Sequence, residues 1–127
     1  MTIQLDHAIV SSRDKQAAAR QLAQLLGVPW GDAAFGPFKA VYVNEGLTLD
    51  FIDTGSALTV EPCFLAQPQE FDAILARLQA AGIAYRSRVA GPVDGQVGTQ
   101  FGGKGVYWNE PDGHQWEMLT VSYARPT

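Results

Sequence analysis

The stretch VYWNEPDGHQWEML, residues 106–119, has the pattern of two β-strands joined by a tight turn. Pro-Asp-Gly at 111–113 favours a turn, and the flanking segments are rich in strand-forming residues. The returning strand carries Glu117 between Trp116 and Met118, where an apolar residue would suit a core strand. A buried carboxylate needs a cation, a hydrogen-bond donor or a proton. Glu117 is therefore the first candidate functional residue.

This hairpin has a counterpart earlier in the chain. VYVNE at 41–45 matches VYWNE at 106–110, and because the second turn is longer by two residues, Asp50 corresponds to Glu117. In each half a strand and an amphipathic helix precede the hairpin. The sequence thus predicts an α+β fold of two tandem βαβββ modules.

The expected elements follow from hydrophobic periodicity and from glycine and proline positions. In the first half we expect a helix that begins after Ser11 or Ser12 and ends at Gly27. In the second half Pro68 starts a helix that Gly82 closes. The expected strands are 3–10, 39–45, 47–53, 59–66, 83–89, 105–110 and 114–123, with loops at 27–37 and 90–103. The 127 residues suit a single domain, with module one at about 1–55 and module two at about 56–127.

Composition narrows the classes of function. The formal net charge is −4 and no run of Lys or Arg is present, so we expect no nucleic-acid or membrane partner. Cys63 is the only cysteine, which rules out an internal disulfide and fits a reducing compartment. The first ten residues contain Gln4, Asp6 and His7 and do not form a signal peptide, so we expect a cytoplasmic protein.

LDHAIV at 5–10, the two-module repeat and NEPDGHQWEML at 109–119 resemble the vicinal oxygen chelate superfamily, also called the glyoxalase/bleomycin resistance/dioxygenase superfamily. The resemblance implies two curved sheets that form a cup, with the helices outside. It also implies a divalent metal at the base of the cup and, in many members, a homodimer.

Carried over position by position, the resemblance implies the metal ligands His7, Asp50, Glu61 and Glu117. One imidazole and three carboxylates make an oxygen-rich site suited to Mn²⁺ or Mg²⁺, with Ni²⁺ and Zn²⁺ as further candidates. Glu61 departs from the histidine that the family often has there, and a charged residue that protects a strand edge is an equal interpretation.

Further residues are candidates for lining a ligand pocket: Cys63, Tyr107, Trp108 and Lys104. The alternatives are a small buried hydrophobe for the lone thiol and core positions for the aromatic residues. GTQFGGKG at 98–105 has glycines and a lysine at P-loop spacing, but Gly105 replaces the Ser or Thr and a strand follows instead of a helix. We expect a flap in which Lys104 or Gln100 contacts an anionic ligand.

The leading hypothesis is a metal-dependent lyase or isomerase that acts on a small oxygen-rich organic molecule, with Glu117 or Glu61 moving a proton. Thiol transfer to a small antibiotic is a variant of it. His114 lies in the hairpin turn, which disfavours a two-histidine iron dioxygenase. The alternative is a metal-free protein that sequesters a small molecule such as an antibiotic, and a subunit that uses only the fold for interaction is a third possibility.

Overall fold

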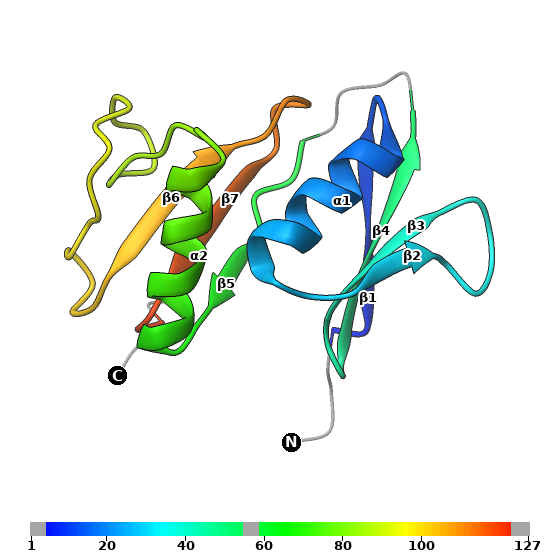
Figure 1. Cartoon of the computed structure of the whole chain (residues 1–127), viewed down its shortest axis with the longest axis horizontal. Helices are drawn as coiled ribbons and strands as arrows, with labels where there is room; N and C mark the ends of the chain where they lie inside the picture. Colours follow the sequence, from blue (N-terminus) through cyan, green and yellow to red (C-terminus); the bar gives the residue numbers. More distant parts are fainter. Residues whose placement is uncertain (1–4, 55–58, 123–127) are drawn as a thin grey trace. The chain divides into compact units, whose positions relative to one another are not determined.

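The computed structural model describes residues 5–54 and 59–122 (Figure 1). The chain divides into two compact units, 1–59 and 60–127, close to the predicted boundary between the modules. The predicted α+β class with a βαβββ-like pattern is confirmed. In the described part of the chain neither helix is long and apolar enough to cross a membrane.

Unit one contains a four-stranded mixed sheet and one helix. The strands lie in the order β1-β4-β3-β2, with β1 parallel to β4 and the other pairs antiparallel. The elements are β1 His7–Ser12, α1 Lys15–Leu26, β2 Trp30–Asp32, β3 Lys39–Asn44 and β4 Leu47–Asp53. The three-residue β2 lies inside the segment that the sequence predicted to be a loop, because so short a strand has no measurable periodicity.

Helix α1 begins and ends at residues with clear capping roles. Asp14 is the N-cap, and its carboxylate accepts a hydrogen bond from the Ala17 N–H at 3.1 Å. The prediction of Ser11 or Ser12 as the cap was wrong, because both lie in β1. Gly27 ends the helix as predicted, with φ of 73°.

One face of the first sheet packs against α1 (Figure 1). The buried apolar residues on the helix and on this face are Ala19, Leu22, Ala23, Leu25, Val10, Val41, Leu49 and Phe51. Strand alternation therefore places His7, Thr48 and Asp50 on the opposite face.

Unit two contains a three-stranded sheet in the order β5-β7-β6, again with one parallel pair, β5 with β7. Its elements are β5 Cys63–Leu65, α2 Pro68–Ala80, β6 Gly105–Asn109 and β7 Gln115–Leu119. Within this unit α2 lies along the sheet (Figure 1), and Phe71, Ile74 and Leu78 are its buried residues. Trp108, Trp116 and Met118 are buried on the strands.

The predicted strand at 83–89 is reduced to an isolated bridge between Arg86 and Tyr107. The next residue, Ser87, forms hydrogen bonds with Asp94 instead of with a strand. The Asp94 carboxylate accepts the Ser87 N–H at 3.0 Å and the Ser87 hydroxyl at 2.5 Å. The backbone then leaves the edge of β6 and enters the glycine-rich loop. The prediction missed this because the capturing aspartate lies seven residues further along the chain.

The two units repeat the same parallel register. Asp50 on β4 faces Ile9 on β1, and Glu117 on β7 faces Cys63 on β5. The antiparallel partners differ, because Asp50 pairs with Ala40 and Glu117 pairs with Tyr107. The internal repeat therefore holds for the parallel pair, while the first hairpin contains a register shift between Tyr42 and Asn44 that the second lacks in its described residues.

Candidate functional site

The face of the first sheet that α1 does not cover lines a pocket of about 390 Å³. That volume lies within the range of small-molecule sites. The lining residues are Asp6, His7, Ala33, Ala34, Phe35, Phe38, Ala40, Tyr42, Thr48 and Asp50. His7 and Asp50, both predicted from the sequence, thus share one pocket within unit one.

His7 has a specific hydrogen bond that the sequence reasoning missed. Its Nδ1 lies 2.9 Å from Oδ2 of Asp6. This hydrogen bond raises the pKa of His7 above 6.5. Desolvation opposes the rise, and the negative charges of Asp6 and Asp50 add to it. In the neutral ring Nδ1 donates to Asp6, so Nε2 carries the lone pair. A carboxylate that orients a histidine in this way is typical of histidine ligands to metals.

Glu117 has a different environment, because its side chain is only 7% exposed. It lines a cavity of about 10 Å³ together with Tyr107, Lys104 and residues of the glycine-rich loop. A cavity of this volume holds about one water molecule. Glu117 is thus enclosed in unit two, and Tyr107 and Lys104, two of the pocket candidates from the sequence, line the same cavity.

The glycines of the flap segment are required by close packing. A Cβ atom at Gly103 would lie 2.5 Å from Oγ1 of Thr120, and one at Gly98 would lie 2.5 Å from the Ser87 carbonyl oxygen. Lys104 forms an ion pair with Asp72 of α2, with Nζ and Oδ1 2.9 Å apart. The loop therefore packs closely on the end of β7 and on α2.

Cys63 is exposed, so its interpretation as a small buried hydrophobe was wrong. Partial removal of the thiol from water, followed by the charge and hydrogen bond of Glu117, raises its pKa from 9.0 to about 12. A thiol with so high a pKa stays protonated and is a poor nucleophile at neutral pH.

Trp108 was predicted to line a ligand pocket, but the structure places it in the core. It is fully buried, and alternation along β6 places it on the face opposite to Tyr107. Its Nε1 atom is buried and has no hydrogen-bond partner within residues 5–54 and 59–122. Trp108 is a core residue and does not line the cavity of Glu117, so it is not part of the aromatic wall that the metal-free binding hypothesis expected, whereas Tyr107 does line that cavity.

Glu61 precedes β5 and is exposed, so its placement on the fifth strand was wrong by two residues. The parallel pairing nevertheless continues toward it, because the Glu117 N–H donates to the Pro62 carbonyl at 3.0 Å and the Gln115 N–H to Val60 at 3.1 Å. Glu61 stands two residues before the partner of Glu117, as His7 stands two residues before the partner of Asp50.

His114 lies in the hairpin turn, as its sequence position predicted, and the structure shows that it is buried there, with 1% of its surface exposed. Its Nδ1 accepts the Val60 N–H at 2.9 Å, and its own backbone N–H donates to Glu110 at 2.9 Å. Arg86 is a further buried polar residue that sequence reasoning missed, and it donates to Asn109 at 2.7 Å and to Gln115. These contacts hold the hairpin together.

Among residues 5–54 and 59–122, no three His, Cys, Asp or Glu side chains are grouped closely enough to hold a metal ion. The predicted ligands are divided between the units, with His7 and Asp50 in the first and Glu61 and Glu117 in the second. The four-ligand set stays a prediction.

No protein-family model matches this sequence, and no curated protein matches it. Solved structures do match. The fosfomycin resistance protein FosX from Mesorhizobium loti is 17% identical with a TM-score of 0.68, covering 97% of this chain and 96% of its own. A glyoxalase/dioxygenase from Nostoc punctiforme is 20% identical with a TM-score of 0.68, covering 94% of this chain and 91% of its own. These two show a shared fold.

Two further structures match almost the whole chain at more than one third identity, and with them the chain belongs to the vicinal oxygen chelate superfamily. They are the oxidases ChaP-H2 and ChaP-H1. ChaP-H2 is 37% identical with a TM-score of 0.89 and covers 98% of both chains. ChaP-H1 is 36% identical with a TM-score of 0.89 and covers 98% of this chain and all of its own.

Proposed function

We propose that this protein is a metal-dependent oxidase that acts on a small oxygen-bearing organic molecule bound in the His7 pocket. The observation that carries the proposal is the pairing of His7 with Asp6 in a pocket that also contains Asp50. The full-length similarity to two oxidases supports this reaction class. The sequence alone did not suggest an oxidase, and the similarity to these two proteins is the reason why an oxidase replaces the lyase or isomerase as the leading candidate.

The residues of the pocket suit a divalent metal. His7 offers Nε2 because Asp6 engages Nδ1, and Asp50 offers carboxylate oxygens on the same face. Glu117 and Glu61 of unit two stay candidate ligands on the family resemblance alone. When bound, the metal would draw electron density from two neighbouring oxygens of the substrate and lower the pKa of a hydroxyl group.

The protein side chains then have defined roles. Asp6 holds the imidazole orientation, and Asp50 accepts a proton from the bound hydroxyl. Oxidation removes two electrons and two protons from the substrate, and dioxygen takes them up to give hydrogen peroxide. Thr48 and Tyr42 line the same pocket and bring hydroxyl groups to its polar side.

The test begins with metal binding. Protein stripped of metal should gain thermal stability with Mn²⁺, Fe²⁺, Ni²⁺, Zn²⁺ or Mg²⁺, by about 3 kcal/mol at a concentration 100-fold above Kd. His7→Gln and Asp50→Asn should remove most of this gain. Glu45→Gln changes an exposed carboxylate in the hairpin turn and serves as the control. The metal site is contradicted if metal does not raise the thermal stability of the wild type. It is also contradicted if the gain is equal in the wild type and all three variants.

The reaction class is tested separately. The metal-loaded protein should consume dioxygen with a panel of catechols and α-hydroxyketones, and hydrogen peroxide should form in equal amount. A lyase or isomerase remains the second candidate, favoured by the single available imidazole, since His114 is buried against Val60. Turnover of the panel under nitrogen, with no dioxygen consumed in air, would establish that second candidate. The homodimer stays a prediction from the family resemblance.

A further inference from the structure

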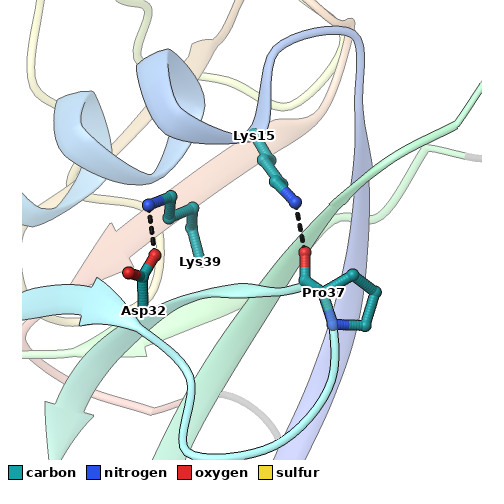
Figure 2. Close-up of polar contacts among 4 residues, drawn as sticks. All are labelled: Lys15, Asp32, Pro37 and Lys39. Atoms are coloured by element: carbon teal, nitrogen blue, oxygen red, sulfur yellow. Dashed lines mark hydrogen bonds and ion pairs between the residues drawn. The ribbon is translucent and has the colours of Figure 1, made fainter.

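The loop between β2 and β3, residues 33–38, is held at both ends by lysine side chains (Figure 2). Lys15 of α1 donates its ammonium group to the Pro37 carbonyl, and Lys39 forms an ion pair with Asp32. The Ala33 N–H also donates to the Phe38 carbonyl at 3.0 Å. These contacts fix the loop against the sheet and α1.

The conformation inside the loop depends on a glycine. Gly36 has φ of 78°, and a Cβ atom there would lie 2.8 Å from the ring of Phe38. Phe38 therefore packs directly over the backbone of Gly36. The turn at Gly36 presents the preceding residue, Phe35, on a loop whose shape is already determined.

Phe35 is the most exposed large hydrophobic residue of the described chain, with 88% of its surface accessible. A phenylalanine held on a fixed loop cannot escape water by a small rearrangement, and its exposure to water is unfavourable. A single exposed apolar residue needs no special explanation, so a contact with a ligand or with a partner has to be argued from the surroundings of Phe35. Which of these applies depends on what lies beside the ring.

Phe35 borders the pocket that contains His7 and Asp50. The polar residues of that pocket are Asp6, His7, Thr48 and Asp50, and its apolar residues are Ala33, Ala34, Phe35, Phe38 and Ala40, with Tyr42 contributing both characters. The pocket thus suits a ligand that has oxygen atoms and an apolar body. The loop supplies most of the apolar lining.

We propose that Phe35 is a specificity-determining residue that contacts the apolar body of the substrate while the substrate's oxygens lie at His7 and Asp50. The inference rests on the proposed function, because it takes the His7 pocket as the substrate site. Phe35 selects ligands by the apolar area beyond the oxygens, and Lys15 and Lys39 keep the loop in place for that contact.

Two diols with the same vicinal oxygens and different apolar areas test the inference. Catechol and 2,3-dihydroxynaphthalene are titrated calorimetrically into Mn²⁺-loaded and metal-free protein under nitrogen. We expect the wild type to bind the naphthalene diol more tightly than catechol. Phe35→Ala should weaken the affinity for the naphthalene diol about tenfold and change the affinity for catechol by less than about twofold. The affinity of Phe35→Leu for the naphthalene diol should lie between those of the wild type and Phe35→Ala. Val93→Ala, at another exposed apolar residue, is the control.

The outcomes separate the inference from the proposed function. If both diols bind in a metal-dependent way and Phe35→Ala leaves their affinity ratio unchanged, the inference is overturned and the proposed function stands. If binding needs no metal but the ratio depends on Phe35, the inference stands and the metal-dependent function is contradicted. If neither diol binds, both are overturned. Light scattering gives a further outcome. If Phe35→Ala leaves the affinity ratio unchanged but converts a dimer to monomers, Phe35 is a subunit contact and the inference is overturned.

Discussion

The two units build the same parallel strand pair but place its carboxylate in opposite surroundings. Asp50 and His7 line a pocket of about 390 Å³ in unit one, whereas Glu117 lines a cavity of about 10 Å³ in unit two. The sheets do not cause the difference, because both carboxylates face the parallel partner strand in the same way. The loops cause it, since 33–38 borders an open pocket and the glycine-rich segment packs over Glu117.

This comparison shows how a duplicated framework gains two chemical environments. A carboxylate beside open solvent keeps its charge at little cost, whereas an enclosed carboxylate depends on its neighbours. The pKa of the neighbouring Cys63 thiol reflects the environment of Glu117, because burial and the charge of Glu117 both raise it. In unit one the residue at the equivalent place in the register is Ile9, which is 54% exposed.

The largest effect is expected where the two units are alike, on the faces covered by the helices. Phe51→Ala in unit one and Trp108→Ala in unit two should each lower the free energy of unfolding by about 3–5 kcal/mol, because both side chains are fully buried. Phe35→Ala, at an exposed position, should change it by less than about 0.5 kcal/mol. Chemical denaturation measures all three. A small loss for Trp108→Ala would return that residue to the list of pocket candidates.

The next effect concerns the reactivity of a thiol placed opposite the carboxylate in each unit, beginning with Cys63 opposite Glu117. Because the pKa of Cys63 is about 12, its thiol stays protonated up to pH values well above 9.0. Alkylation by iodoacetamide at pH 8 should be about 30-fold slower than that of a free cysteine, since lower thiolate content outweighs higher nucleophilicity. Glu117→Gln should speed it about threefold by removing a negative charge.

A thiol introduced in unit one gives the matched comparison. Ile9→Cys in a Cys63→Ser background places a thiol opposite Asp50 on the open face. It should react within about threefold of a free cysteine, because the pocket there is open to water. Equal rates for the two thiols would show that the glycine-rich loop does not enclose Glu117 in solution.

The smallest effect separates the two hairpin turns. Asn44 stabilises the first by accepting the Gly46 N–H at 2.8 Å, whereas the second contains the buried Glu110, whose carboxylate accepts the His114 N–H. Burial raises the pKa of Glu110 above 4.5. Its contribution to stability is therefore present below pH 4.5 and is lost as the pH rises through the folded-state pKa.

Glu110→Gln should flatten this dependence, because the amide oxygen still accepts the hydrogen bond and carries no charge. We expect a Tm higher than wild type by no more than about 3 °C at pH 7, with the difference vanishing near pH 4. Thermal melts across that range measure it. A destabilised variant at pH 7 would show that the charge of Glu110 strengthens the turn.

Much of this protein is determined by its sequence alone. The repeated hairpin, the two amphipathic helices and the glycines at their ends come from local patterns, because periodicity and backbone conformation act over a few residues. The face shared by Thr48 and Asp50 also follows from alternation along one strand. The strand pattern also singled out Glu117, whereas His7 came from the family resemblance, and their joint role as ligands stays a prediction.

Other features were decided only by the tertiary structure. Asp94 ends the expected strand at 83–89 because its carboxylate accepts the N–H of Ser87, which lies seven residues earlier in the chain. Trp108 and Tyr107 are neighbours in sequence with the same strand propensity, yet one is core and the other lines the cavity of Glu117. Sequence alternation separates such residues into two faces, but only the tertiary structure decides which face joins the apolar core and which one meets the glycine-rich loop, because those contacts join segments far apart in the chain.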